Sequence, residues 1–408
     1  MCRVTSYWDA TSTSDLPPEC ATWPKSCDVL IIGAGFTGLV AAYYLGKAGL
    51  DVVICEQHTV AYGASGRNGG QLLGGWPGDL SAMRKWLGWE MAQALWEISE
   101  EALGRVPRLV KQASIHCDLQ AVGHLEAAGG YAAARALQEE LSLLQAIATH
   151  SYAWWDRARV LKKVGTQAYV GGLYDPSGLA FHPKKYVLGL AQAAARENVR
   201  LYQSTPVHAV GRLNSGRFRI HTQRGSVESD AVVLATNAYA PRFAHYVKAR
   251  LRSVYSAQVL VQLDNPEQLP RTMPTVSDRQ ASYNYYRRVG DRGLLFGGRA
   301  VPAELRMGHY PSVVEQLRHV FPNVTDPRVL YQWSGRIALS SDYMPHLRQL
   351  PNGVWTASGY TGHGAALSTQ MGWLLSQAVL HGRLCDQVRL LDSLPWRHWA
   401  LRRETLNF

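Results

Sequence analysis

The first residues with a clear chemical use are the glycines of Gly33-Ala34-Gly35-Phe36-Thr37-Gly38. They follow an apolar run at 27–32 and open a helical pattern that ends near Lys47. In such a unit the first glycine permits a tight turn, the second lets backbone N–H groups approach a pyrophosphate, and the third lets helix and strand pack closely. Glu56 ends the next strand, 18 residues beyond Gly38, where a carboxylate accepts hydrogen bonds from a ribose. The spacing predicts a dinucleotide site; the alternative is an ordinary glycine turn beside a solvated glutamate.

A second glycine-rich segment follows, Gly63-Ala64-Ser65-Gly66-Arg67-Asn68-Gly69-Gly70-Gln71. Its small residues would let backbone amides approach a ligand, and Arg67 would meet phosphate charge. The alternative is a flexible surface loop. The first glycine motif does not distinguish NAD from FAD, because both use the same unit. The choice of cofactor therefore depends on this second segment.

The elements that must position these loops alternate as in an α/β fold. A continuous apolar run such as 27–32 is typical of a buried parallel strand. Residues 1–26 are polar and proline-containing, and we expect an extended arm there. Further strands are expected at 51–55, 118–126, 199–202, 207–213, 217–223, 230–235 and 354–357, with strands dominating 251–299. Helices are expected at 81–112, 131–150, 183–197, 311–321 and 365–380.

Composition and charge exclude several classes of protein. The 408 residues are 47% hydrophobic and 18% charged, which fits a globular chain with a large core. The net charge of +11 comes from dispersed basic residues, so we expect no nucleic-acid partner. The six cysteines have no CxxC spacing and lie near no histidine cluster. We therefore expect no metal site and no disulfide scaffold, and a cytoplasmic protein.

One stretch could be mistaken for a membrane span. Residues 29–46 are 18 residues without a charge, which is a marginal length for a spanning helix. Four glycines interrupt them, so we interpret the stretch as a strand, a turn and a helix. The N-terminus lacks the basic and apolar regions of a signal peptide, and no stable membrane insertion is expected.

The segment 63–71 resembles the flavin loop of the D-amino-acid oxidase/glycine oxidase superfamily, and most closely its γ-glutamylputrescine oxidase and L-pipecolate oxidase branch. The resemblance covers nearly the whole chain. The motifs that carry it occur in the same order: 6–8, 172–178 with His182-Pro183, 233–239, 284–287, 333–335, 342–346 and 359–364. It implies a Rossmann-like FAD-binding domain of the glutathione-reductase type with an inserted substrate domain, made of a mixed β-sheet plus helices.

The resemblance also implies domain limits and cofactor contacts. The FAD-binding domain would comprise 27–110, 152–243 and 332–381, the substrate domain 111–151 and 244–331, and the C-terminal tail 382–408. The residues expected to bind FAD, without a covalent bond, are Gly33, Gly35, Phe36, Thr37, Gly38, Glu56, Gln57, Ser65, Gly66, Arg67, Asn68, Gly69, Gly70, Gln71, Val207, Ala235, Thr236, Gly335, Gly362, His363 and Gly364. The amides of 362–364 would face the pyrimidine end of the flavin, where a helix N-terminus stabilises negative charge.

An amine oxidase of this type needs no nucleophile. A hydride passes from the carbon next to a neutral amine to flavin N5, the imine is hydrolysed, and oxygen is reduced to hydrogen peroxide. The residues expected to touch substrate or flavin here are Tyr283, Tyr285, Arg336 and His363. Tyr283 and Tyr285 would share one face of a strand. For these tyrosines and for His363, the alternative is ordinary core packing.

The substrate class follows from a missing arginine. Amino-acid oxidases of the superfamily bind the substrate carboxylate with an arginine two residues after the Trp-x-Gly motif, and that position here is Ile337. Arg336 is adjacent but should point the other way, unless a bulge re-aims it. This favours an amine substrate such as γ-glutamylputrescine or a related amine, or a substrate whose carboxylate is held further from the reacting carbon. A cyclic or N-substituted amino acid such as L-pipecolate is the alternative, anchored for example by Arg287.

The sequence departs from the family pattern at two points and leaves three rival functions open. Arg348 stands where the family usually has glycine, and a loop that needs φ > 0 would strain it, so either the loop is rebuilt or the edge of the pocket differs. No cysteine occurs between Cys117 and Cys385, so covalent flavin is not expected. The rivals are a tRNA-modifying flavoenzyme, a dehydrogenase that passes electrons to a membrane quinone, and a flavin-binding protein without turnover.

Overall fold

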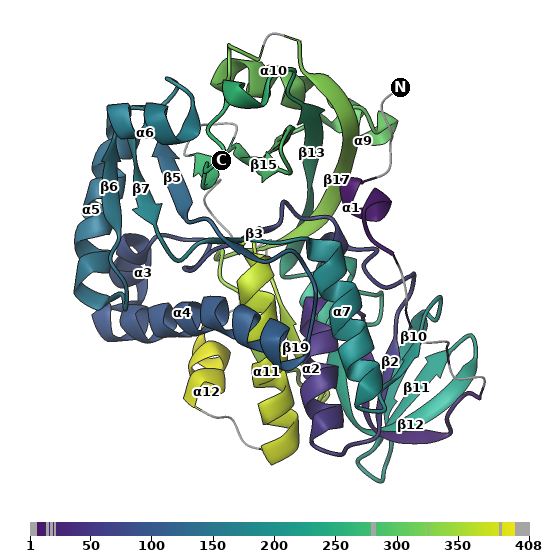
Figure 1. Cartoon of the computed structure of the whole chain (residues 1–408). Helices are drawn as coiled ribbons and strands as arrows, with labels where there is room; N and C mark the ends of the chain where they lie inside the picture. Colours follow the sequence, from purple (N-terminus) through teal and green to yellow (C-terminus); the bar gives the residue numbers. More distant parts are fainter. Residues whose placement is uncertain are drawn as a thin grey trace.

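The computed structural model describes residues 6–13, 16, 19, 22–278, 283–324, 326–382 and 386–395. Two eight-stranded sheets organise them, one in the lower and one in the upper half of Figure 1. A three-stranded sheet lies between them, formed by β3 (Gln71–Leu72), β8 (Leu179–Ala180) and β4 (Gln120–Ala121). This mixed α/β architecture confirms the predicted fold class.

The first sheet has a parallel centre. β1 (Ser26–Ile32) pairs in parallel with β2 (Val52–Cys55) and with β12 (Gly225–Leu234). The other strands are β9 (Arg200–Tyr202), β10 (Val207–Arg212), β11 (Phe218–Thr222), β18 (His346–Gln349) and β19 (Trp355–Ser358). The apolar runs of the central strands are buried on both faces. On one face their side chains pack against helices, and on the other they form a second apolar cluster that includes Tyr202 and Phe218.

Three helices lie side by side against this sheet: α2 (Phe36–Lys47), α7 (Pro183–Arg196) and α11 (Gly364–His381). The charge-free stretch 29–46 is thus the strand, turn and helix that the sequence predicted. In the described part of the chain, no helix is long and apolar enough to cross a membrane.

The second sheet carries the other core. Its strands run in the order β17 (Arg328–Ser340), β13 (Leu251–Gln262), β16 (Gly293–Gly298), β15 (Tyr285–Val289), β14 (Thr275–Asp278), β5 (His124–Ala128), β7 (Gly171–Asp175) and β6 (Ala153–Asp156). The helices α6 (Arg157–Val164), α9 (Pro302–Met307) and α10 (Pro311–Val320) contribute apolar side chains to this core. The described helices that complete the fold are α1 (Tyr7–Ala10), α3 (Leu80–Leu87), α4 (Trp89–Gln112), α5 (Tyr131–Ile147), α8 (His245–Lys248) and α12 (Asp386–Ser393).

Two predicted elements are divided. The helix expected at 81–112 is broken into α3 and α4 at Gly88, which has φ +86°. The strand expected at 118–126 is divided into β4 and β5, because Gly123 has φ +73°. Both glycines adopt a left-handed conformation that ends a regular element.

The predicted domain limits stay a prediction, and the boundaries between the sheets fall at other residues. The sequence assigned 152–243 and 332–381 to the FAD-binding domain. In the structure, β6 and β7 belong to the second sheet, and β17 continues in that sheet to Ser340. The periodicity of a strand shows that it is a strand but does not show which sheet it joins.

Candidate functional site

The glycine turn between β1 and α2 brings backbone amides to the carboxyl end of the first sheet. Gly33 has φ +106°, which a side chain would strain. A Cβ on Gly38 would collide with the carbonyl oxygen of Gly33, so only glycine lets the helix begin this close to the strand. Gly35 is the N-cap of α2 and has no side chain to occupy the amides of the first turn. The Phe36 N–H is bonded to Ser65 Oγ at 3.1 Å, and the N-terminus of α2 as a whole forms a ready anion site.

Glu56 lies directly after β2 and faces this turn. Its Oε2 accepts a hydrogen bond from the N–H of Ala34 at 2.8 Å, and its Oε1 accepts one from the N–H of His58 at 2.9 Å. Each carboxylate oxygen has a further lone pair. The carboxylate is therefore fixed in orientation and still able to accept a hydrogen bond from a ribose hydroxyl.

Four side chains from other parts of the chain hold the second glycine-rich segment: Trp8, Gln258, Arg287 and Trp333. We call these four residues the loop clamp. The carbonyl of Arg67 accepts hydrogen bonds from Gln258 Nε2 at 2.7 Å and Trp333 Nε1 at 2.9 Å. The next carbonyl, of Asn68, accepts one from Trp8 Nε1 at 2.9 Å. The carbonyl of Gly69 accepts one from Arg287 Nε at 2.9 Å. Three consecutive peptide groups are thereby fixed by bonds to their carbonyls.

A cavity of about 1150 Å³ lies between the two loops and extends to the second sheet. It is larger than the roughly 300–1,000 Å³ of a pocket for a drug-sized ligand. Three buried polar atoms of its lining have no hydrogen-bond partner among the described residues: Thr236 Oγ1, Gln258 Oε1 and Ser368 Oγ. Since unpaired buried polar atoms are costly, these atoms and the glycine cradle fit a large polar ligand such as FAD.

Most residues predicted from the sequence line this cavity. They are Gly33, Gly35, Phe36, Thr37, Glu56, Gln57, Ser65, Arg67, Asn68, Gly69, Gln71, Val207, Ala235, Thr236, Tyr283, Tyr285, Gly335, Arg336, Gly362, His363 and Gly364. Gly38, Gly66 and Gly70 are not in the lining. A Cβ on Gly66 would collide with the Ala61 carbonyl, and one on Gly70 with the Phe181 carbonyl, so these glycines allow close packing behind the loop.

His363 lies at the N-terminus of α11 and lines the cavity. Its Nε2 donates a hydrogen bond to the carbonyl oxygen of Gly74 at 3.2 Å. A carbonyl oxygen only accepts, so Nε2 carries the proton. Burial lowers the pKa of His363 below its usual value. The imidazole is therefore neutral at neutral pH, with Nδ1 unprotonated.

The two predicted tyrosines both line the cavity, but not for the predicted reason. β15 begins at Tyr285, and Tyr283 precedes it with φ +46°, so strand alternation does not extend to Tyr283. Tyr283 is half exposed, whereas the Tyr285 hydroxyl is bonded to Ser256 Oγ at 2.8 Å. Burial raises the pKa of Tyr285 above its usual value, so this phenol stays neutral.

Arg287 does not fit the role of a substrate anchor. Besides Gly69, it donates from Nη2 to the Phe181 carbonyl at 2.8 Å, and it is not part of the cavity lining. Burial lowers its pKa to about 10, which leaves it protonated at neutral pH. The suggestion that Arg287 binds a substrate carboxylate is therefore wrong, because its donors are used to hold backbone.

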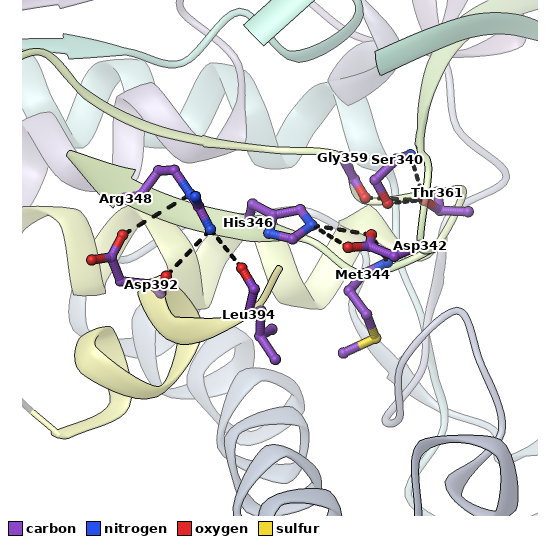
Figure 2. A network of polar contacts seen from close by, with 9 residues as sticks. All are labelled: Ser340, Asp342, Met344, His346, Arg348, Gly359, Thr361, Asp392 and Leu394. Carbon is purple, nitrogen blue, oxygen red and sulfur yellow. Dashed lines mark hydrogen bonds and ion pairs between the residues drawn. The ribbon is translucent and has the colours of Figure 1, made fainter. Parts of the chain in front are cut away.

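Of the two alternatives at Arg348, the structure agrees with a rebuilt loop. Arg348 lies in the regular strand β18 and has no positive φ. Figure 2 shows its guanidinium reaching α12 and the residues after it, with Nη2 donating to the Leu394 carbonyl at 2.8 Å. It does not line the cavity. Here an arginine side chain fastens the C-terminal helix to the first sheet.

The turn before β18 approaches the cavity. His346 Nε2 lies 2.9 Å from Asp342 Oδ2, and this buried pair closes the turn 342–346, as Figure 2 shows. Tyr343, within the turn, has φ +63° and lines the cavity. The motif 342–346 is recognisable in the sequence, but Tyr343 was not predicted as a site residue.

Other lining residues were also missed. Among them are Tyr239, Arg252, Tyr255 and Arg299. Tyr239 ends the family motif 233–239, and this motif could have identified it as a site residue. Arg252, Tyr255 and Arg299 reach the cavity because β13 and β16 pair in the second sheet, and that pairing leaves no signal in the sequence.

The comparisons with known proteins agree with this geometry. The sequence matches the family described as FAD dependent oxidoreductase (DAO) over residues 28–378. The chain belongs to this family. It is an FAD-dependent oxidoreductase, and FAD is its cofactor.

Relatives of this DAO-family chain include two bacterial proteins. A probable oxidoreductase OrdL of Haemophilus influenzae is 29% identical over 93% of this chain and 88% of its own length. A γ-glutamylputrescine oxidoreductase of Escherichia coli is 28% identical over 92% of this chain and 89% of its own length. In structure, the chain resembles glycine oxidase from Geobacillus kaustophilus, with a TM-score of 0.73, 22% identity, and coverage of 87% of this chain and 95% of that one.

The described residues bear on how the FAD is held. Cys55 is the only cysteine of the described lining, and burial raises the pKa of its thiol to about 12. A protonated thiol is a poor nucleophile. Non-covalent binding stays a prediction. Within the described ranges, no group of three or more His, Cys, Asp or Glu lies together as a metal site would require.

Proposed function

We propose that this protein oxidises an amine, with γ-glutamylputrescine or a related amine as its substrate. The observation that carries the proposal is Ile337, an apolar residue in the cavity at the position where amino-acid oxidases of the resembling superfamily use arginine. Ile337 faces Gly362 in the turn before α11. A carboxylate beside the reacting carbon would meet no cation there. The name of the Escherichia coli relative supports the same substrate.

Bound FAD supplies the hydride acceptor: the carbon next to the amine gives up a hydride, water hydrolyses the imine, and oxygen is reduced to hydrogen peroxide. The residues of the chain position the substrate and exclude water from it. Tyr285 and Ile337 present neutral surfaces, which disfavour a protonated amine and so favour the neutral amine that can lose a hydride. The N-terminus of α11, with the neutral His363, directs partial positive charge into the cavity.

This proposal makes the protein an enzyme of polyamine catabolism that acts in the cytoplasm on a small molecule. Purified holoprotein should be supplied in air with γ-glutamylputrescine, putrescine, L-pipecolate or L-proline, while oxygen and hydrogen peroxide are measured. The expected result is oxidation of γ-glutamylputrescine, with one peroxide formed for each oxygen consumed.

Three results would contradict parts of this proposal. Oxidation of L-pipecolate alone would favour the cyclic amino acid. Substrate loss without peroxide would replace oxygen by another acceptor, such as a quinone. No oxidation of any small molecule would favour a tRNA substrate or a flavoprotein without turnover.

A further inference from the structure

The part of the cavity that the second sheet lines is basic. Arg252, Arg299 and Arg336 line it, from β13, the end of β16 and β17. Within the described lining the only carboxylate is Glu56, which is bonded to backbone amides at the glycine turn. A free diamine or polyamine, cationic at neutral pH, would meet charges of its own sign on this side.

A second cavity of about 630 Å³ adjoins the first. The two share four lining residues: Asn237, Ala238, Arg252 and Arg336. The second cavity adds Lys248, and its described lining contains no carboxylate. Arg252 and Arg336 therefore stand where the two cavities meet, in a region where every charged group of the described lining is a cation.

Arg336 is the best-placed cation of this region. Its guanidinium carbon lies 5.3 Å from the centre of the Tyr239 ring, and its partner across the strand pair is Tyr255. None of its five N–H donors makes a hydrogen bond to a described residue, and it forms no ion pair there. A planar guanidinium stacked on an aromatic ring keeps its edge free for a carboxylate, which it binds through two parallel hydrogen bonds.

We propose that Arg336, with Arg252 and Lys248, binds a carboxylate of the substrate that is remote from the amine being oxidised. The inference rests on the proposed function and specifies its substrate class. Ile337 faces Gly362 in the turn before α11, and the neighbouring residue along a strand points to the opposite face. A carboxylate on Arg336 is consequently several bonds away from the carbon that reacts. The substrate is an amine with a distal carboxylate, such as a γ-glutamyl amide, and not a free polyamine.

The test compares two substrates and three variants. The substrates are γ-glutamylputrescine and the same compound with its carboxylate converted to a neutral carboxamide. Arg336→Met removes the charge and keeps the apolar stem, while Arg336→Lys keeps a charge without the planar fork. The matched control is Arg328→Met, at the exposed start of the same strand and outside both cavities.

We expect Arg336→Met to raise KM for the carboxylate substrate by about 10- to 100-fold, the effect of losing a charged hydrogen bond. KM for the carboxamide should change less than about twofold, and kcat should be preserved for both. Arg336→Lys should recover part of the loss. Glutarate, which has no amine to oxidise, should perturb the flavin spectrum of the wild type with a dissociation constant that rises similarly in Arg336→Met.

The outcomes separate this inference from the proposed function. If the wild type oxidises both compounds with equal KM, the carboxylate site is wrong and amine oxidation stands. If Arg336→Met impairs both compounds equally, Arg336 has a general role and the inference is again wrong. If the wild type oxidises neither compound, the proposed function itself fails.

Discussion

The substitution Trp8→Phe tests how the loop clamp supports FAD binding. Trp8 is 1% exposed, and its Nε1 bonds the Asn68 carbonyl at 2.9 Å. Phenylalanine keeps an aromatic ring against His182 and Trp333, whose ring centres lie 4.7 and 6.1 Å away, but it has no N–H. The carbonyl of Asn68 is then left without its donor, which costs about 1–3 kcal/mol.

The cost falls on the loop conformation that faces the cofactor. If FAD binding requires that conformation, the dissociation constant of FAD should rise by roughly 5- to 150-fold. Apoprotein would be titrated with FAD, with the quenching of flavin fluorescence as the measure of binding. Thermal unfolding of the apoprotein would give the loss of stability separately.

The matched control is Trp96→Phe. Trp96 is 5% exposed, and its Nε1 has no hydrogen-bond partner among the described residues. This variant loses comparable packing but no hydrogen bond, so its affinity for FAD should stay within about threefold of the wild type. If Trp8→Phe binds FAD as tightly as Trp96→Phe does, the reasoning about the loop clamp is refuted.

Three further predictions concern the cofactor, pH and the C-terminal helix. Gly35→Trp should purify without yellow colour, because a Cβ at this position would already lie 2.9 Å from Ser65 Oγ. Gly211→Trp is the control: a Cβ there meets open space, so this variant should keep its flavin. Burial lowers the pKa of His124 and of His182 to about 4, from 6.5. Between pH 6.5 and 4 the unfolded chain therefore binds more protons than the folded chain. The free energy of unfolding, measured in urea, should fall as the pH is lowered through this window, by roughly 3 kcal/mol at most for each histidine. A free energy of unfolding that does not change with pH would contradict this prediction. Arg348→Met should lower the free energy of unfolding by about 1–3 kcal/mol and expose α12 to proteolysis, while the FAD content stays unchanged. A drop in FAD content would show that Arg348 affects the FAD-binding site.

The cofactor-binding half of the site could be predicted from sequence because local rules determine it. The turn at Gly33 needs a positive φ, and Gly38 needs the absence of a side chain, so both residue types are fixed by backbone geometry. The apolar runs at β1 and β2 fix the strands that carry the turn and Glu56. These features lie within 30 residues of one another and do not depend on the second sheet.

The substrate half depends on contacts between distant parts of the chain. Arg287 was a candidate anchor in the sequence, but it holds the carbonyls of Gly69 and Phe181, more than 100 residues away, and lies outside the cavity lining. Tyr283 was predicted to lie in a strand, but β15 begins only at Tyr285, so its place in the cavity did not follow from alternation. The loop at Arg348 was expected to be rebuilt or to alter the pocket edge, and Asp392 and Leu394 supply hydrogen-bond partners that no local pattern predicts. Strand ends and tertiary partners are the features that the local pattern did not specify.

An anaerobic titration of the purified protein with γ-glutamylputrescine, followed by flavin absorbance, examines the proposed chemistry without any coupled assay. We predict that the oxidised flavin band bleaches with one equivalent of substrate and returns when air is admitted. L-pipecolate should leave the band unchanged. A band that bleaches with L-pipecolate and not with γ-glutamylputrescine, or with neither, would contradict the proposal that this FAD-dependent oxidoreductase is an amine oxidase.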